Sequence, residues 1–131
     1  MPQTLLQFYQ DDDGSVPVRD WLAGLQQTDR RAFAKCVAAI DRLAALGHEL
    51  RRPHADLLRD GIYELRVRHQ RVNYRVLYFF HGQNVAFLAH GLVKEKRVPN
   101  ADIERALARK QKLQNNPAKH TYRGGDGDGE D

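Results

Sequence analysis

Two β-strand patterns separated by three residues constrain the fold of this chain more than any other feature of its sequence. From Ile62 to Arg68 apolar and charged residues alternate, and Val72 to Phe80 is a near-continuous run of aromatic and β-branched residues. Alternation with a period of two indicates a strand with one buried face. Strands joined by so short a turn pair antiparallel, so this region predicts a hairpin centred on Gln70-Arg71.

The rest of the chain predicts two more strands and three helices. The expected strands are Thr4–Tyr9 and Val85–Val93, and turn residues at 81–84 precede the second one. The first expected helix starts near Pro17. The second has Thr28 as its N-cap and ends at Gly47. The third starts at Pro99–Asp102 and ends at 115–117. We therefore expect an α+β domain, with an N-terminal strand and a helical hairpin packed on an antiparallel sheet and helices covering one face.

Length and composition favour one soluble domain. With 131 residues, we expect a single domain over 1–114, followed by a disordered Gly/Asp-rich tail over 115–131. No apolar run approaches the roughly 20 residues that span a bilayer, and the N-terminus does not resemble a signal peptide, so a cytoplasmic protein without a membrane partner is expected. The single cysteine, Cys36, excludes an intramolecular disulfide and lies on an apolar helix stripe. The six histidines show no metal-ligand spacing, so we expect no metal and no other cofactor.

Positive charge is concentrated in one segment. The chain carries 21 basic and 17 acidic residues, but four of the acids lie in the last eight residues. Between Gly61 and Pro99 only Glu64 and Glu95 oppose seven cations, which are Arg66, Arg68, Arg71, Arg75, Lys94, Lys96 and Arg97. Such an excess is typical of an anion-binding surface, although a solubilising surface has the same composition.

The hairpin register sharpens this prediction. A turn centred on Gln70-Arg71 places Arg66 directly opposite Arg75, and Lys94 follows the next strand. Like charges opposite one another repel, so we expect a bound anion, and arginine forks bind phosphate bidentately. An ion pair of Arg66 with Glu64 or Glu95 is the structural alternative.

His90 precedes the basic end of the last expected strand. A histidine there is a candidate acid or base near neutral pH, and a purely structural role is the alternative.

Several segments, taken in order, resemble one protein family. They are Val16-Pro17-Val18-Arg19-Asp20-Trp21-Leu22, Leu46-Gly47, Gly61-Ile62-Tyr63-Glu64-Leu65-Arg66, Asn73-Tyr74-Arg75-Val76-Leu77-Tyr78-Phe79-Phe80, His90-Gly91-Leu92-Val93-Lys94 and Pro99. Together they resemble the phage-derived HigB-type branch of the RelE/ParE toxin superfamily. The resemblance covers about Leu5 to Lys110 and implies a small RelE-like domain.

The resemblance also implies a function. Such toxins belong to type II toxin–antitoxin systems, where they cut mRNA on the ribosome without a metal and are held inactive by an Xre-type helix-turn-helix (HigA-like) antitoxin. Matching positions imply that Arg66, Arg75 and Lys94 are catalytic. We expect Arg68, Arg71, Lys96, Arg97 and His90 to contact the RNA.

The chain departs from the family pattern at two positions. Leu92 stands where a phenylalanine is usual, and Glu95 replaces the second of two lysines. A catalytically weak or inactive module that binds RNA, the ribosome or the antitoxin is therefore the second hypothesis.

Overall fold

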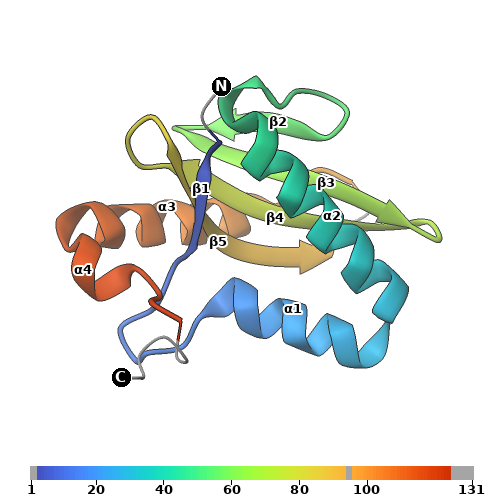
Figure 1. The fold of residues 1–131 in the computed structure, drawn as a ribbon, viewed down its shortest axis with the longest axis horizontal. Coiled ribbons are helices and arrows are strands. Elements are labelled where there is room, and N and C mark those ends of the chain that lie inside the picture. Colours follow the sequence, from blue (N-terminus) through green and yellow to red (C-terminus); the bar gives the residue numbers. More distant parts are fainter. Residues whose placement is uncertain (1–2, 94–95, 125–131) are drawn as a thin grey trace.

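A five-stranded sheet flanked by helices forms the protein (Figure 1), which confirms the α+β class. The computed structural model describes residues 3–93 and 96–124. The strands are β1 (Leu5–Phe8), β2 (Ala55–Arg59), β3 (Ile62–His69), β4 (Val72–Phe80) and β5 (Val85–Val93). The helices are α1 (Pro17–Thr28), α2 (Arg30–Leu46), the 3-10 turn η1 (Gly47–Glu49), α3 (Asn100–Asn115) and α4 (Pro117–His120). Within the described residues, no helix is both long and apolar enough to cross a membrane.

The sheet differs from the predicted one in two ways. Its strand order is β1-β5-β4-β3-β2, and β2 is a strand that the sequence pattern did not predict. In addition, β1 runs parallel to β5, with Leu5 opposite Val85 and Phe8 opposite Leu88, so the sheet is mixed rather than antiparallel. The helical hairpin α1–α2 and three strands separate β1 from β5 in sequence, and so long a connection allows parallel pairing.

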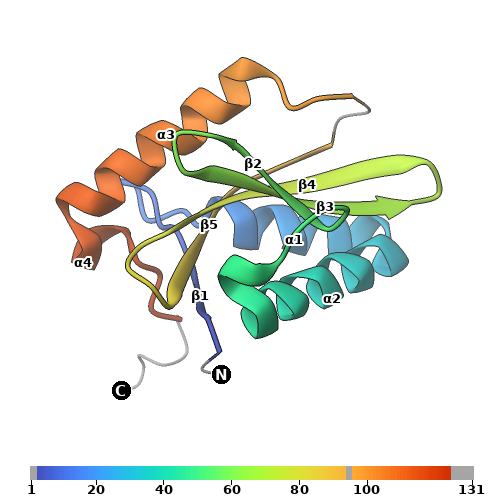
Figure 2. The same cartoon turned by 90° about the horizontal axis from the view of Figure 1, so that it is seen from above.

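Helices cover both faces of the sheet, which corrects the expectation of one covered face (Figure 2). Helices α1 and α2 pack on one face, while α3 crosses the other. Two apolar clusters result, one containing Tyr78 and Leu65 beneath α2 and one containing Phe79 and Leu77 beneath α3. The central strand β4 is apolar on both faces because both are covered.

Local signals set most helix ends. Gly47, with φ of 52°, ends α2, and Pro99 precedes α3, as predicted. The N-cap of α2 is Asp29 rather than Thr28, because the Asp29 carboxylate accepts a hydrogen bond from the N–H of Ala32 at 3.1 Å. Thr28 is instead the last residue of α1.

The folded part of the chain continues past residue 114, so the predicted domain boundary lies too early. Helix α4 follows α3 at once, and Thr121 then pairs with Tyr9 in an antiparallel bridge. The ring of His120 stacks on that of Tyr9, with centroids 5.4 Å apart, and is buried. This packing holds 115–124 on the domain. The remaining Gly/Asp-rich residues, 125–131, lie outside the described part of the chain.

Candidate functional site

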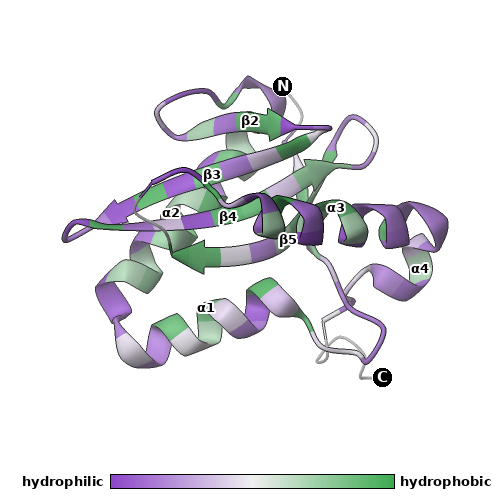
Figure 3. Ribbon diagram, turned by 180° about the vertical axis from the view of Figure 1, so that it is seen from behind, coloured by the Kyte–Doolittle hydropathy of each residue, from purple (hydrophilic) through white to green (hydrophobic). Residues whose placement is uncertain are grey.

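Arg66 and Arg75 lie directly opposite each other on β3 and β4, as the hairpin register predicts. The turn residues Gln70 and Arg71 have φ of 50° and 70°, the left-handed conformation that a tight two-residue hairpin requires. Both arginines lie on the face of the sheet that α3 crosses. The ends of β3 and β4 next to their hairpin turn are hydrophilic, and α3 does not cover them (Figure 3).

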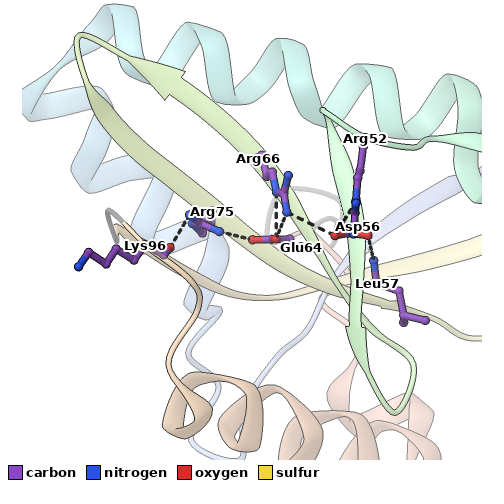
Figure 4. Close-up of polar contacts among 7 residues, drawn as sticks. All are labelled: Arg52, Asp56, Leu57, Glu64, Arg66, Arg75 and Lys96. Atoms are coloured by element: carbon purple, nitrogen blue, oxygen red, sulfur yellow. Dashed lines mark hydrogen bonds and ion pairs between the residues drawn. The ribbon is translucent and has the colours of Figure 1, made fainter.

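A buried carboxylate joins the two arginines (Figure 4). The Glu64 side chain is only 3% exposed, and its Oε1 accepts a hydrogen bond from Arg75 Nη1 at 2.5 Å. Its Oε2 accepts from Arg66 Nε at 2.9 Å and lies 2.8 Å from Arg66 Nη2. Glu64 thus offsets the repulsion between two guanidinium groups and fixes the direction of both forks.

The chain of charges continues onto the edge strand β2. Arg66 Nη2 also lies 3.4 Å from Asp56 Oδ2, and that oxygen accepts from Arg52 Nε at 3.0 Å. We call the alternating series Arg75, Glu64, Arg66, Asp56 and Arg52 the arginine row. The structure therefore contains the Arg66–Glu64 ion pair that the sequence left open, alongside the cluster of cations.

Arg75 is the most buried cation of the arginine row. Its side chain is 11% exposed, and its Nη2 donates to the backbone carbonyl of Lys96 at 2.5 Å. This bond ties the segment after β5 to the centre of the sheet. The Nε–H of Arg75 is buried and has no acceptor among the described residues. A buried unpaired donor costs free energy, which a bound acceptor offsets.

Among the hollows that the arginine row borders, two adjoin each other at Arg66 and Arg75. One, of about 580 Å³, is lined by Asp56, Leu58, Glu64, Arg66, Asn73, Arg75, Arg97, Val98 and Ile103. The other, of about 330 Å³, is lined by Pro53, His54, Arg66, Val67, Arg68, Asn73, Tyr74 and Arg75. Arg66 and Arg75 belong to both. Ligand-binding clefts measure roughly 300–1,000 Å³, so these hollows have the size of a small-ligand or nucleotide site.

The remaining predicted site residues are distributed around these hollows. Arg68 and Arg71 are exposed at the hairpin end, and Lys96 and Arg97 are exposed on the segment that leads to α3. Arg97 lines the larger hollow together with both central arginines. Lys94, predicted to be catalytic, lies outside the described residues, as does Glu95.

His90 lies beneath α3, where it takes part in a separate network. Its Nε2 is 2.7 Å from Asp102 Oδ1, and Arg109 Nη1 lies 3.3 Å from its Nδ1. Since Arg109 is a donor and Asp102 an acceptor, the hydrogen bonds fit a neutral ring protonated at Nε2. Burial lowers the pKa of His90, and Arg109 adds to this effect although Asp102 opposes it. This geometry supports the structural alternative for His90.

Asp56 and Arg52 are the members of the arginine row that sequence reasoning missed. Both depend on β2, and β2 is short and lacks an alternating pattern. The dipeptide Asp60-Gly61 is a hairpin-turn signal that could have indicated a strand before β3. Both residues have positive φ and form the turn between β2 and β3. In the described ranges, no group of three or more histidine, cysteine or acidic residues is arranged to hold a metal ion.

Comparison with known proteins assigns the chain to a family. Residues 20–111, which include the arginine row, match the model of the family described as phage-derived protein Gp49-like (DUF891). A search of curated proteins gives no match. The Gp49-like family is part of the RelE/ParE-like toxin superfamily, in agreement with the resemblance seen in the sequence. The chain is therefore a member of the phage-derived Gp49-like family of the RelE/ParE-like toxin superfamily.

Proposed function

We propose that this protein is the HigB-type toxin of a type II toxin–antitoxin system and cuts mRNA on the ribosome, in the cytoplasm. Family membership supports a toxin module. The observation that carries the proposed chemistry is the pair of arginines, Arg66 and Arg75, held opposite each other by one buried carboxylate. Two guanidinium groups fixed beside hollows of nucleotide size are suited to binding a phosphate.

The proposed reaction uses the RNA as its own nucleophile. The 2′-hydroxyl gives up its proton as its oxygen bonds to the adjacent phosphorus, the bond to the 5′-oxygen breaks, and the 5′-oxygen takes up a proton. The products are a 2′,3′-cyclic phosphate and a 5′-hydroxyl. Negative charge grows on the five-coordinate phosphorus, and donors already in position stabilise it without reorganisation. DNA lacks the 2′-hydroxyl and should not be cut.

The carboxylates leave donors available for this role. Glu64 and Asp56 engage Nε and Nη2 of Arg66, so its Nη1 makes no hydrogen bond to another described residue. In Arg75, Nη1 and Nη2 each make one hydrogen bond and carry a second N–H, and the buried Nε–H has no acceptor among the described residues. We propose that these groups face the phosphate, with Lys94 as a third catalytic cation. Arg68, Arg71, Lys96 and Arg97 would contact neighbouring phosphates.

Induced expression in bacteria tests the proposal. Wild-type protein should arrest growth and yield cut transcripts, and Arg75→Lys should reduce both because lysine keeps the charge but lacks the planar fork. Arg75→Ala should abolish both, with folding checked by circular dichroism since it leaves the buried Oε1 of Glu64 without its donor while Oε2 stays paired with Arg66. Arg59→Ala is the matched control, because Arg59 is ion-paired with Asp60 and Glu104 away from the arginine row. Normal growth and intact transcripts with soluble wild-type protein would contradict the proposal.

A second candidate function is a non-cleaving module that binds RNA, the ribosome or an antitoxin. Two observations favour it: Glu64 and Asp56 already accept hydrogen bonds from Arg66, and Glu95 stands where a lysine is usual in the family. Co-sedimentation with ribosomes while transcripts stay intact would select this candidate.

The proposed partner in either case is an Xre-type helix-turn-helix antitoxin. Co-expression of the neighbouring small reading frame should suppress growth arrest, and the two proteins should co-purify. Separate elution of the two proteins would contradict this pairing.

A further inference from the structure

One edge of β3 is open beyond Arg66, the central residue of the arginine row. The first residue of β2, Ala55, pairs with Leu65, so in the described sheet no strand lies beside β3 beyond Arg66. Helix α2 passes alongside this edge. Between them lies a hollow of about 290 Å³, lined by Lys35, Ala38, Ala39, Arg42, His54, Arg66, Val67 and Arg68. We call it the α2–β3 groove.

The α2–β3 groove is basic. Its lining contains four cations and no carboxylate, and the alanines of α2 leave it open. Lys35 and Arg42 are seven residues apart, two helical turns, so they lie on one face of α2. Neither they nor Arg68 form an ion pair with another described residue. The arginine row, in contrast, has its charge partly neutralised by Glu64 and Asp56.

One contact with a backbone carbonyl and one with the ring of His54 hold these side chains across the groove. Lys35 Nζ lies 3.4 Å from the carbonyl oxygen of Arg68, and Arg42 Nη1 lies 3.2 Å from His54 Nδ1. The N–H of Arg66 donates to the carbonyl of His54 at 2.8 Å, which anchors His54 to β3. Because Arg42 Nη1 can only donate, Nδ1 of His54 is the acceptor in this contact and Nε2 is the ring nitrogen that carries an N–H.

The α2–β3 groove is continuous with the proposed cleavage site. Arg66 and Arg68 line both the groove and the 330 Å³ hollow beside Arg75. A path of cations therefore runs from Arg97, over Arg75 and Arg66, around the edge of β3 to Lys35 and Arg42. A chain of phosphates is the ligand whose charge is distributed in this way.

We propose that the α2–β3 groove binds the sugar-phosphate backbone of the mRNA strand that continues from the arginine row. The proposal rests on the proposed function, since it needs a phosphate at Arg66 and Arg75. It adds Lys35 and Arg42 as residues that bind flanking nucleotides without touching the reacting phosphate. His54 contributes a ring N–H donor at Nε2.

Binding of fluorescent single-stranded RNA by the full chain tests the proposal. Every 2′-hydroxyl is methylated to prevent cleavage, and a dinucleotide is compared with a decanucleotide. The double variant Lys35→Gln/Arg42→Gln should weaken decanucleotide binding about tenfold and leave the dinucleotide unchanged. Loss of two phosphate contacts should reduce the slope of log K against log salt by about 1.4, at roughly 0.7 per contact for single strands.

The matched control removes the same charge elsewhere. Arg19→Gln/Arg105→Gln replaces two exposed cations of α1 and α3 that do not line the groove. This control should retain decanucleotide affinity and salt slope, and thermal unfolding confirms that both double variants are folded. If both double variants weaken decanucleotide binding equally, the effect is one of overall charge, and the proposed role of the α2–β3 groove is refuted.

Four further outcomes would also overturn the proposal, and they differ in their meaning for the proposed function. If the wild type binds both oligonucleotides equally, the groove is not used while the arginine row still is. If it binds neither, the proposed function fails as well. If Lys35 and Arg42 affect co-sedimentation with ribosomes but not binding of the decanucleotide, the groove binds ribosomal RNA. If the groove binds an acidic decapeptide and no RNA, its partner is a protein.

Discussion

Replacing Glu64 by glutamine tests the centre of the arginine row with the smallest change of shape. The side chain keeps its volume and one acceptor oxygen but loses its charge and its second acceptor. In the structure Oε1 accepts a hydrogen bond from Arg75, and Oε2 accepts one from Arg66. Glu64→Gln therefore leaves two guanidinium groups opposite each other without the carboxylate between them.

The size of the effect follows from burial. The side chains of Glu64 and Arg75 are 3% and 11% exposed, whereas that of Arg66 is 38% exposed and regains water. Removing one partner of a buried ion pair costs about 3–5 kcal/mol. We expect a loss near the lower limit, about 3 kcal/mol, because Arg66 rehydrates and only Arg75 stays desolvated. For a domain of this size that corresponds to a decrease in Tm of roughly 10 °C.

The assay combines thermal unfolding with added phosphate. In Glu64→Gln the forks of Arg66 and Arg75 are free for an anion, so phosphate should raise the Tm of the variant more than that of the wild type. An anion at ten times its Kd contributes about 1.4 kcal/mol to the folded state. Sodium chloride at equal ionic strength controls for screening. RNA cleavage should fall in parallel, since the forks lose their fixed direction.

Glu104→Gln provides the comparison. Glu104 lies 2.6 Å from Arg59 in a pair whose side chains are 59% and 35% exposed, and such surface pairs contribute little. Its Tm and phosphate response should match those of the wild type. If Glu64→Gln and Glu104→Gln have the same small effect, Glu64 does not hold the arginine row together and the reasoning fails.

Two further predictions concern residues beneath the helices. Because the folded pKa of His90 lies below 6.5, the unfolded chain binds a proton first, and stability should fall as pH drops from about 6.5 toward that lower value. Urea titrations of His90→Gln should show a shallower pH dependence over this window, and an unchanged slope would contradict the assigned network. At Gly91 an added Cβ would lie 2.4 Å from Trp21, so Gly91→Ala should destabilise by about 1–3 kcal/mol. Gly24→Ala, in α1 with nothing within 4 Å, should instead stabilise by about 0.5–1 kcal/mol in the same thermal unfolding measurement, and the reverse order would refute the packing argument.

Local sequence patterns predicted the elements with the strongest periodicity. The bounds of β4 and β5 agree with their apolar runs, and α2 ends at Gly47 as its left-handed conformation requires. The miss at β2 has a physical cause, because Ala55–Arg59 is an edge strand that needs only one partner and carries no alternating pattern. The N-cap of α2 moved from Thr28 to Asp29 because two adjacent residues can both cap, and only the folded backbone selects one.

The C-terminal boundary was misplaced for a non-local reason. Residues 115–124 are polar, and a stretch of that composition does not predict packing. In the structure His120 stacks on Tyr9, and Thr121 pairs with it, although more than 100 positions separate these residues in the sequence. Contacts at such a distance along the chain leave no local periodicity.

The sequence by itself determined the hairpin, and with it the position of Arg66 opposite Arg75, because strand register follows from alternation and turn length. Only the tertiary structure decided what those arginines contact. It placed Glu64 between them in a buried position, brought Asp56 alongside from an unpredicted strand, and set α2 with Lys35 and Arg42 against the open edge of β3. Periodicity specifies which face a side chain occupies, whereas its charge partners depend on which elements pack together.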